Sequence, residues 1–130
     1  MSPSTDSPAV LHVCRSCTRR GIATAGPALA AALREALAEA VGSAVEVRES
    51  RCLGECRRRC RACIVGAGRW SWLFGDLHPD QDLGALVLFI RHWLAAPDGR
   101  VASEDRPAGI RWHLIGRVPP PDHAPPGGLQ

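Results

Sequence analysis

The stretch Ala44-Val-Glu-Val-Arg-Glu-Ser50 alternates apolar and charged residues and leads almost directly into Cys52. An alternation with a period of two predicts a half-buried β-strand. Residues 9–13 form a second short run of apolar and β-branched side chains, which predicts a buried strand that ends at Cys14. Each of the two predicted strands therefore delivers a cysteine to its carboxyl end.

Residues 27–41 lie between these strands and repeat apolar side chains at helical spacing. Pro27 occupies a position that the first turn of a helix tolerates, and Gly42 follows the last periodic residue. A strand, a helix and a strand in succession favour parallel pairing of the two strands. Parallel pairing would bring the two cysteine segments to the same edge of a sheet.

Farther along, residues 62–67 and 70–74 predict two short strands joined as a hairpin. Residues 79–95 predict a second amphipathic helix with two aspartates in its first turn, and residues 110–118 a final strand or extended strap. The predicted fold is α/β: a thioredoxin-like small mixed sheet flanked by two main helices. We expect residues 1–8 to be a disordered leader, 9–118 the cluster- or metal-binding domain, and 119–130 a flexible tail rich in proline and glycine.

The composition fits one domain of an intracellular protein. The chain has 130 residues, a length typical of a single domain. Its six cysteines form two tight clusters, whereas the cysteines of a disulfide scaffold are spread across the fold. The polar start shows no secretory signal, and no apolar run is long enough to span a membrane. We expect a cytoplasmic location, where exposed thiols stay reduced and can act as ligands.

The two clusters are Cys14-Arg-Ser-Cys17 and Cys52-Leu-Gly-Glu-Cys56-Arg-Arg-Arg-Cys60-Arg-Ala-Cys63. Four thiolates that converge from neighbouring loops can hold a [2Fe-2S] cluster. Side-by-side strand ends would bring Cys14 and Cys17 against Cys52 and Cys56. Gly54 has no side chain and would let backbone amides approach the cluster sulfur.

The Cys52-Leu-Gly-Glu-Cys56 motif resembles the second cysteine pair of the thioredoxin-like [2Fe-2S] ferredoxins and of the related small subunit of respiratory complex I. The chain is more similar to an uncharacterised bacterial group of small cysteine-rich proteins described as metal-binding. The segments that carry this similarity over about residues 10–120 are the two cysteine clusters, Trp70-Ser-Trp-Leu-Phe-Gly-Asp-Leu77, Arg106-Pro107 and Arg117-Val-Pro-Pro120.

The ferredoxin resemblance implies a one-electron carrier, which is not itself an enzyme, with Cys14, Cys17, Cys52 and Cys56 as cluster ligands. Those ferredoxins separate their first two ligands more widely and do not generally carry Cys60 and Cys63. Cys60 is therefore a reserve ligand, and Cys63 a weaker candidate.

Two other chemistries remain open. Cys14-x-x-Cys17 and Cys60-x-x-Cys63 have the spacing of two zinc knuckles, so the protein can alternatively hold, store or deliver Zn²⁺ or another thiophilic metal. The pair Cys14 and Cys17 after a strand also suits thiol-disulfide exchange. Against exchange, the predicted helix begins about ten residues after the motif, so we expect its dipole not to act on Cys14.

All sixteen basic residues are arginines, and the net charge is +3. Residues 48–61 hold six arginines against two acids, a local charge of +4. We expect this arginine-rich cysteine loop to dock an acidic redox-partner protein through charge-steered contacts. A single basic loop without interleaved aromatic residues gives little reason to expect nucleic-acid binding. The sequence leaves the oligomeric state open, a homodimer included.

Overall fold

The computed structural model describes residues 8–15, 25–51 and 60–121. Five strands and two main helices make up the described fold, together with short 3-10 turns. In chain order the main elements are β1 (Ala9–Cys14), α1 (Ala25–Val41), β2 (Val45–Ser50), β3 (Ala62–Val65), β4 (Ser71–Phe74), α2 (Leu83–Ala95) and β5 (Leu114–Val118). The 3-10 turns are η2 (Gly42–Ala44), η3 (Ser103–Asp105) and η4 (Ala108–His113).

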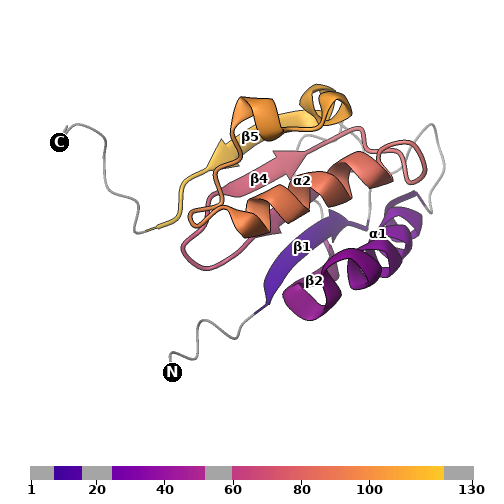
Figure 1. Cartoon of the computed structure of the whole chain (residues 1–130). Helices are drawn as coiled ribbons and strands as arrows, with labels where there is room; N and C mark the ends of the chain where they lie inside the picture. The colour runs from indigo at the N-terminus through magenta and orange to yellow at the C-terminus, as the bar shows by residue number, and fades with distance from the viewer. Residues whose placement is uncertain (1–7, 16–24, 52–59, 122–130) are drawn as a thin grey trace, which may run out of the picture.

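The strands form one mixed sheet in the order β2-β1-β3-β4-β5. β1 and β2 pair in parallel, with Ala9 opposite Val45 and Cys14 opposite Ser50. β3, β4 and β5 are added by antiparallel pairing, so that β1 and β4 run in one direction and β3 and β5 in the other. Figure 1 shows the arrowheads of β1 and β4 at one edge of the sheet and that of β5 at the opposite edge. This arrangement confirms the predicted α/β class and is consistent with a thioredoxin-like fold.

Both main helices cover the same face of the sheet (Figure 1), and the apolar core lies between them and the strands. Alternate residues of each strand point toward the helices, as the pleat requires. On β1 these are Ala9, Leu11 and Val13, all buried in the core cluster, while Val10 and His12 are only half-buried. The face that carries His12 is not covered by a helix within the described residues.

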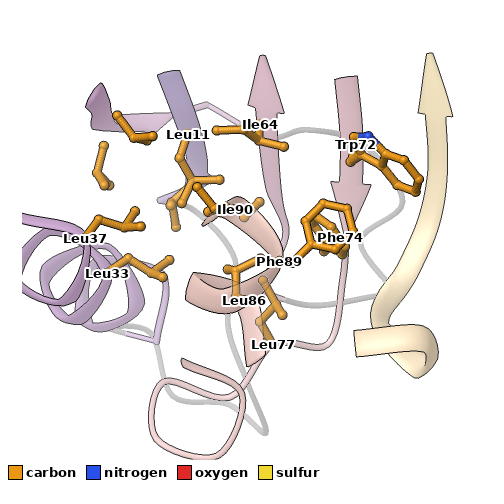
Figure 2. Packing of buried hydrophobic residues seen from close by; sticks show 14 of the residues in the cluster. Leu11, Leu33, Leu37, Ile64, Trp72, Phe74, Leu77, Leu86, Phe89 and Ile90 are labelled. Carbon is orange, nitrogen blue, oxygen red and sulfur yellow. The ribbon is translucent and has the colours of Figure 1, made fainter. Parts of the chain in front are cut away.

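The second helix fills the centre of the core with aromatic and branched side chains. Figure 2 shows Phe89 of α2 against Phe74 and Trp72 of β4. Both ring pairs meet edge to face with centroids 5.0 Å apart, a favoured geometry for aromatic side chains. On the other side Leu33 and Leu37 of α1 lie toward Leu11 (Figure 2). The aromatic side chains of β4 thus serve the core, as the alternation in residues 70–74 indicates.

The second helix begins at Leu83, four residues later than predicted, because a self-contained turn precedes it. The backbone N–H groups of Asp80 and Gln81 donate to Nδ1 of His78, and the N–H of His78 donates to Oδ2 of Asp82 at 2.7 Å. Side-chain bonds of this kind compete with the helical ladder. Asp80 therefore lies in the turn, and Asp82 is the residue that precedes the helix.

The C-terminal segment is divided into two elements. Residues 110–113 belong to η4, and only Leu114–Val118 pairs with β4. The contacts of the His113 ring explain why η4 ends and β5 begins at this point. Its Nδ1 lies 2.9 Å from the carbonyl oxygen of Gly75, and its Nε2 lies 3.0 Å from Oδ1 of Asp82. This polar bridge fixes the start of β5 against the turn before α2.

Candidate functional site

Cys14 is the last residue of β1, in the interior of the sheet, and its side chain is fully buried. Its backbone N–H donates to the carbonyl oxygen of Arg61 at 3.0 Å, and the N–H of Arg15 donates to the carbonyl oxygen of Ser50 at 2.9 Å. The end of β1 is thus held on both sides, by the segment that enters β3 and by the end of β2. These two hydrogen bonds fix the backbone at Cys14.

The chain leaves β2 on one side of β1 and enters β3 on the other side. Arg51 follows the carboxyl end of β2, and Cys60 precedes the amino end of β3, both at the edge where β1 ends. Two strands that flank a third lie about 10 Å apart, which corresponds to two strand spacings. Of the predicted ligands, Cys17, Cys52 and Cys56 lie outside the described residues. The described neighbours of these three cysteines in sequence, Arg15, Arg51 and Cys60, all lie at this one edge.

The first turn of α1 lies directly against Cys14. A Cβ atom on Gly26 would stand 2.3 Å from the carbonyl oxygen of Cys14 and 3.1 Å from Cα of Arg15, so only glycine fits. The helix begins at Ala25, well after the Cys14-x-x-Cys17 motif as the sequence predicts, yet its first turn meets the backbone of Cys14 in space. The positive end of the helix dipole lies beside the Cys14 backbone, and such a position favours negative charge.

Cys60 has an unusual backbone. Its φ is +54°, in the left-handed region that non-glycine residues seldom adopt. The side chain is fully buried and belongs to the apolar core cluster, and the carbonyl oxygen accepts a hydrogen bond from the N–H of Leu77 at 3.3 Å. Left-handed backbone costs an L-residue about 1 to 2 kcal/mol, so the surrounding structure must hold it in place. Nothing in the sequence indicates this conformation.

Cys63 lies within β3, directly opposite His12 of β1 in the antiparallel register. Its neighbours Ala62 and Ile64 are buried in the core, so the pleat directs Cys63 to the sheet face that no described helix covers. Burial raises the pKa of the Cys63 thiol, which favours the protonated, non-ligating form. A zinc knuckle requires both thiols to come from one tight turn. Here Cys60 packs in the core and Cys63 lies within β3, so the pair does not meet this requirement.

His12 lies on β1, two residues before Cys14. Its Nδ1 lies 2.8 Å from Oγ of Ser50, the residue opposite Cys14 in the register. Three neighbouring strands thus bring polar side chains close together: His12 lies on β1, Ser50 on β2 and Cys63 on β3. In the described part of the chain, however, no group of three or more histidine, cysteine or acidic side chains could hold a metal ion.

The arginine-rich loop is less uniformly exposed than its sequence indicates. Arg61 is fully buried, and Arg48 forms a 2.9 Å ion pair with Glu46 on the exposed edge of β2. The side-chain hydrogen bond from Arg48 lowers the pKa of Glu46. Arg51 is exposed, whereas residues 57–59 lie outside the described residues. Of the three described arginines in this stretch, two are thus engaged within the fold and Arg51 is exposed.

The comparisons with known proteins identify a family but no activity. The family model described as a protein of unknown function (DUF1636) matches residues 11–120. No curated protein and no solved structure matches the chain. The matched range contains all six cysteines and every strand except the first two residues of β1. Within the described residues, no helix is both long enough and apolar enough to cross a membrane.

Proposed function

The chain belongs to the DUF1636 family, and we propose that it is a one-electron carrier that binds one [2Fe-2S] cluster through Cys14, Cys17, Cys52 and Cys56. The observation that supports this most is the position of Cys14 between the carboxyl end of β2 and the amino end of β3. The segment with the second cysteine cluster departs at Arg51 and returns at Cys60, on opposite sides of β1. In a chain built this way, both cysteine segments begin at one edge of one sheet.

The donor chemistry fits an iron-sulfur cluster. Thiolates are the usual protein ligands, and the cluster, when bound, supplies reversible one-electron oxidation and reduction. The Cys14 thiol is buried but does not belong to the apolar core cluster, in contrast to Cys60. By strand alternation it lies on the sheet face that carries His12, which no described helix covers. The two backbone hydrogen bonds at the end of β1 restrain the backbone that carries this proposed ligand.

Cys60 and Cys63 are assigned supporting roles. Cys60, the reserve ligand, packs within the apolar core cluster, to which Cys14 does not belong. Cys63 is a protonated thiol within a strand. We propose that neither is a ligand in the resting protein. Arg51 and residues 57–59 would then offset the negative charge of the thiolate-bound cluster and meet an acidic redox-partner protein in the cytoplasm.

One observation favours a second candidate function. The first turn of α1 lies against the backbone of Cys14, and a Cys-x-x-Cys pair that follows a strand and lies beside a helix start suits thiol-disulfide exchange. Cys14 and Cys17 can in that case act as a dithiol that exchanges with a disulfide. A bound zinc ion is the remaining alternative for the same thiols.

One preparation separates these candidates. Protein purified without oxygen is analysed for iron, zinc and acid-labile sulfide, and its visible spectrum is recorded before and after dithionite. The proposal predicts a red-brown protein with about two irons and two sulfides per chain, bleached on reduction. A colourless protein with stoichiometric zinc would replace the electron carrier with a zinc protein. A metal-free protein whose Cys14 and Cys17 form a reversible disulfide would establish the exchange reaction.

A further inference from the structure

A cleft of about 490 Å³ opens at the end of the sheet that lies away from Cys14. Its wall is formed by the chain that follows α2 and by the end of β5, which Figure 1 shows together at the edge opposite the arrowhead of β1. The strand register shows that the cleft and Cys14 lie at opposite ends of the sheet. Arg117 pairs with Trp72 near the amino end of β4, whereas Cys14 lies at the carboxyl end of β1, which runs in the same direction as β4. The cleft is therefore distinct from the cysteine site.

Three arginines line the cleft, and two of them are held over indole rings. The guanidinium carbon of Arg106 lies 5.0 Å from the ring centre of Trp72, and that of Arg117 lies 5.1 Å from Trp70 and 5.5 Å from Trp72. Nε of Arg106 also donates to the carbonyl oxygen of Val101 at 3.0 Å. Stacking restricts the two planar groups and leaves N–H donors at their edges for a ligand.

The frame behind these arginines is rigid. The indole N–H of Trp72 donates to the carbonyl oxygen of Gly99 at 2.8 Å, and the backbone N–H of Trp70 donates to the carbonyl oxygen of Asp98 at 2.8 Å. Gly99 has a φ of +75°, and a Cβ there would lie 2.8 Å from side-chain atoms of Arg69 and Trp93. The loop after α2 is thus fixed to β4, and the arginines are arranged before a ligand arrives.

The charges in the cleft do not balance. Arg100 forms a 2.8 Å ion pair with Asp98, the acidic residue among those that line the cleft in the described structure. Three arginines against one aspartate leave a charge of +2, carried by Arg106 and Arg117. Burial, followed by the nearby positive charges of Arg117 and Arg111, lowers the pKa of Arg106. A bound anion would offset this crowding of like charges.

We propose that the cleft binds a small molecule that carries a phosphate group, with Arg106 and Arg117 as the principal ligands of that group. Paired guanidinium groups suit a doubly charged oxyanion because each can donate two parallel hydrogen bonds. The volume falls within the range of small-molecule sites and exceeds what one phosphate fills. The apolar wall formed by Pro97, Val101 and Ala102 receives the remainder of the ligand, and the hydroxyl of Ser103 is a further lining donor.

The test is a titration of the full chain with inorganic phosphate and with phenyl phosphate at constant ionic strength, followed by amide and indole NMR signals. Saturable shifts are expected at the Trp72 indole and in residues 96–106, with phenyl phosphate binding more tightly than phosphate. Arg117→Gln and Arg106→Gln should each weaken binding about tenfold or more, the loss expected for a charge-assisted hydrogen bond. Arg91→Gln, which removes an exposed arginine of α2 outside the lining, should leave the affinity unchanged.

Arg106 contacts the core, so its variant can lose stability as well as affinity. Arg117 is exposed, and Arg117→Lys keeps its charge while removing the forked donor. The proposal therefore also predicts weaker binding in this variant, whose fold the NMR spectrum verifies. Failure to saturate below about 10 mM of either anion, or equal losses in the Arg91→Gln control, would overturn the proposal. These results do not depend on metal content, so the proposed electron-carrier function stands or fails separately.

Discussion

The backbone N–H of Cys14 donates a hydrogen bond to the carbonyl oxygen of Arg61 at 3.0 Å. This bond joins the start of the first cysteine segment to the residue that follows Cys60, across 47 positions of sequence. It continues the antiparallel pairing of β1 and β3 past the last registered pair, Val13 with Ala62. The pairing of β1 with β3 therefore determines how Cys14 and the residue that follows Cys60 are placed relative to each other.

The contact between Gly26 and Cys14 predicts a large penalty for a methyl group. Gly26→Ala places Cβ within 2.3 Å of the Cys14 carbonyl oxygen, and relief of this overlap should cost about 1 to 3 kcal/mol of unfolding free energy. Gly84→Ala is the matched control, because Gly84 is also the second residue of a helix and has open space around it. Its helix should gain about 0.5 kcal/mol. Urea denaturation measures both, and equal effects would contradict the close packing of α1 on Cys14.

A second pair of glycines isolates the packing of the loop after α2. Gly99 and Gly68 both have positive φ, at +75° and +70°, but only Gly99 is enclosed, by Arg69, Trp93 and Trp70. Gly68→Ala should cost about 1 kcal/mol from backbone strain alone. Gly99→Ala adds steric overlap and should cost roughly 2 to 4 kcal/mol. If the two variants unfold at the same urea concentration, the loop is not anchored as the structure indicates.

The bridge between His113 and Asp82 should be energetically coupled. Their side chains are only 16% and 17% exposed, so water screens the 3.0 Å contact weakly. We propose a double-mutant cycle with His113→Gln and Asp82→Asn. The loss of unfolding free energy in the double variant should be about 1 kcal/mol smaller than the sum of the losses in the two single variants. Thermal or urea unfolding of the three variants gives the coupling directly. Strict additivity would mean that the contact does not stabilise the start of β5.

Cys63 should alkylate slowly, with a pH profile displaced to the alkaline side. Burial raises the pKa of its thiol, so at a given pH the reactive thiolate is scarcer than in a free thiol such as glutathione. The same shift links folding to protonation of Cys63. The contribution of the protonated thiol to stability is complete below the pKa of Cys63 in the unfolded chain and is lost as the pH rises through its pKa in the folded protein.

Iodoacetamide labelling followed by trypsin digestion can measure this, because cleavage after Arg61 and Arg69 yields a peptide in which Cys63 is the sole cysteine. The labelling rate should rise at higher pH than that of glutathione. Labelling of native Cys63 at the glutathione rate near pH 8 would contradict its burial.

The regular parts of this fold follow from local sequence patterns. The alternation in residues 44–50 and the apolar run before Cys14 predict two strands, and the structure confirms them as the parallel pair β1 and β2. The helical period of residues 27–41 predicts α1 to within two residues of its start. The start of α2 was missed because His78 and Asp82 bond to nearby backbone groups, which a hydrophobic period does not register.

The other features missing from the sequence interpretation depend on contacts between distant segments. The left-handed Cys60, the fully buried Arg61 and the approach of Gly26 to Cys14 arise where three strand ends and a helix start meet. The cleft has the same origin. The β4-β5 register brings Arg117 opposite Trp72, and the chain that follows η3 brings Arg106 to the same ring.

The central claim is that the two cysteine segments share one metal cluster, and the iron content of single cysteine variants tests it most directly. Wild-type protein, Cys14→Ser, Cys52→Ser and Cys63→Ser are purified together without oxygen and analysed for iron and acid-labile sulfide per folded chain. We predict about two irons per chain in the wild type and in Cys63→Ser, and loss of most iron and sulfide in both Cys14→Ser and Cys52→Ser. Retention of the wild-type iron content in either of the last two variants would contradict a cluster shared by both segments.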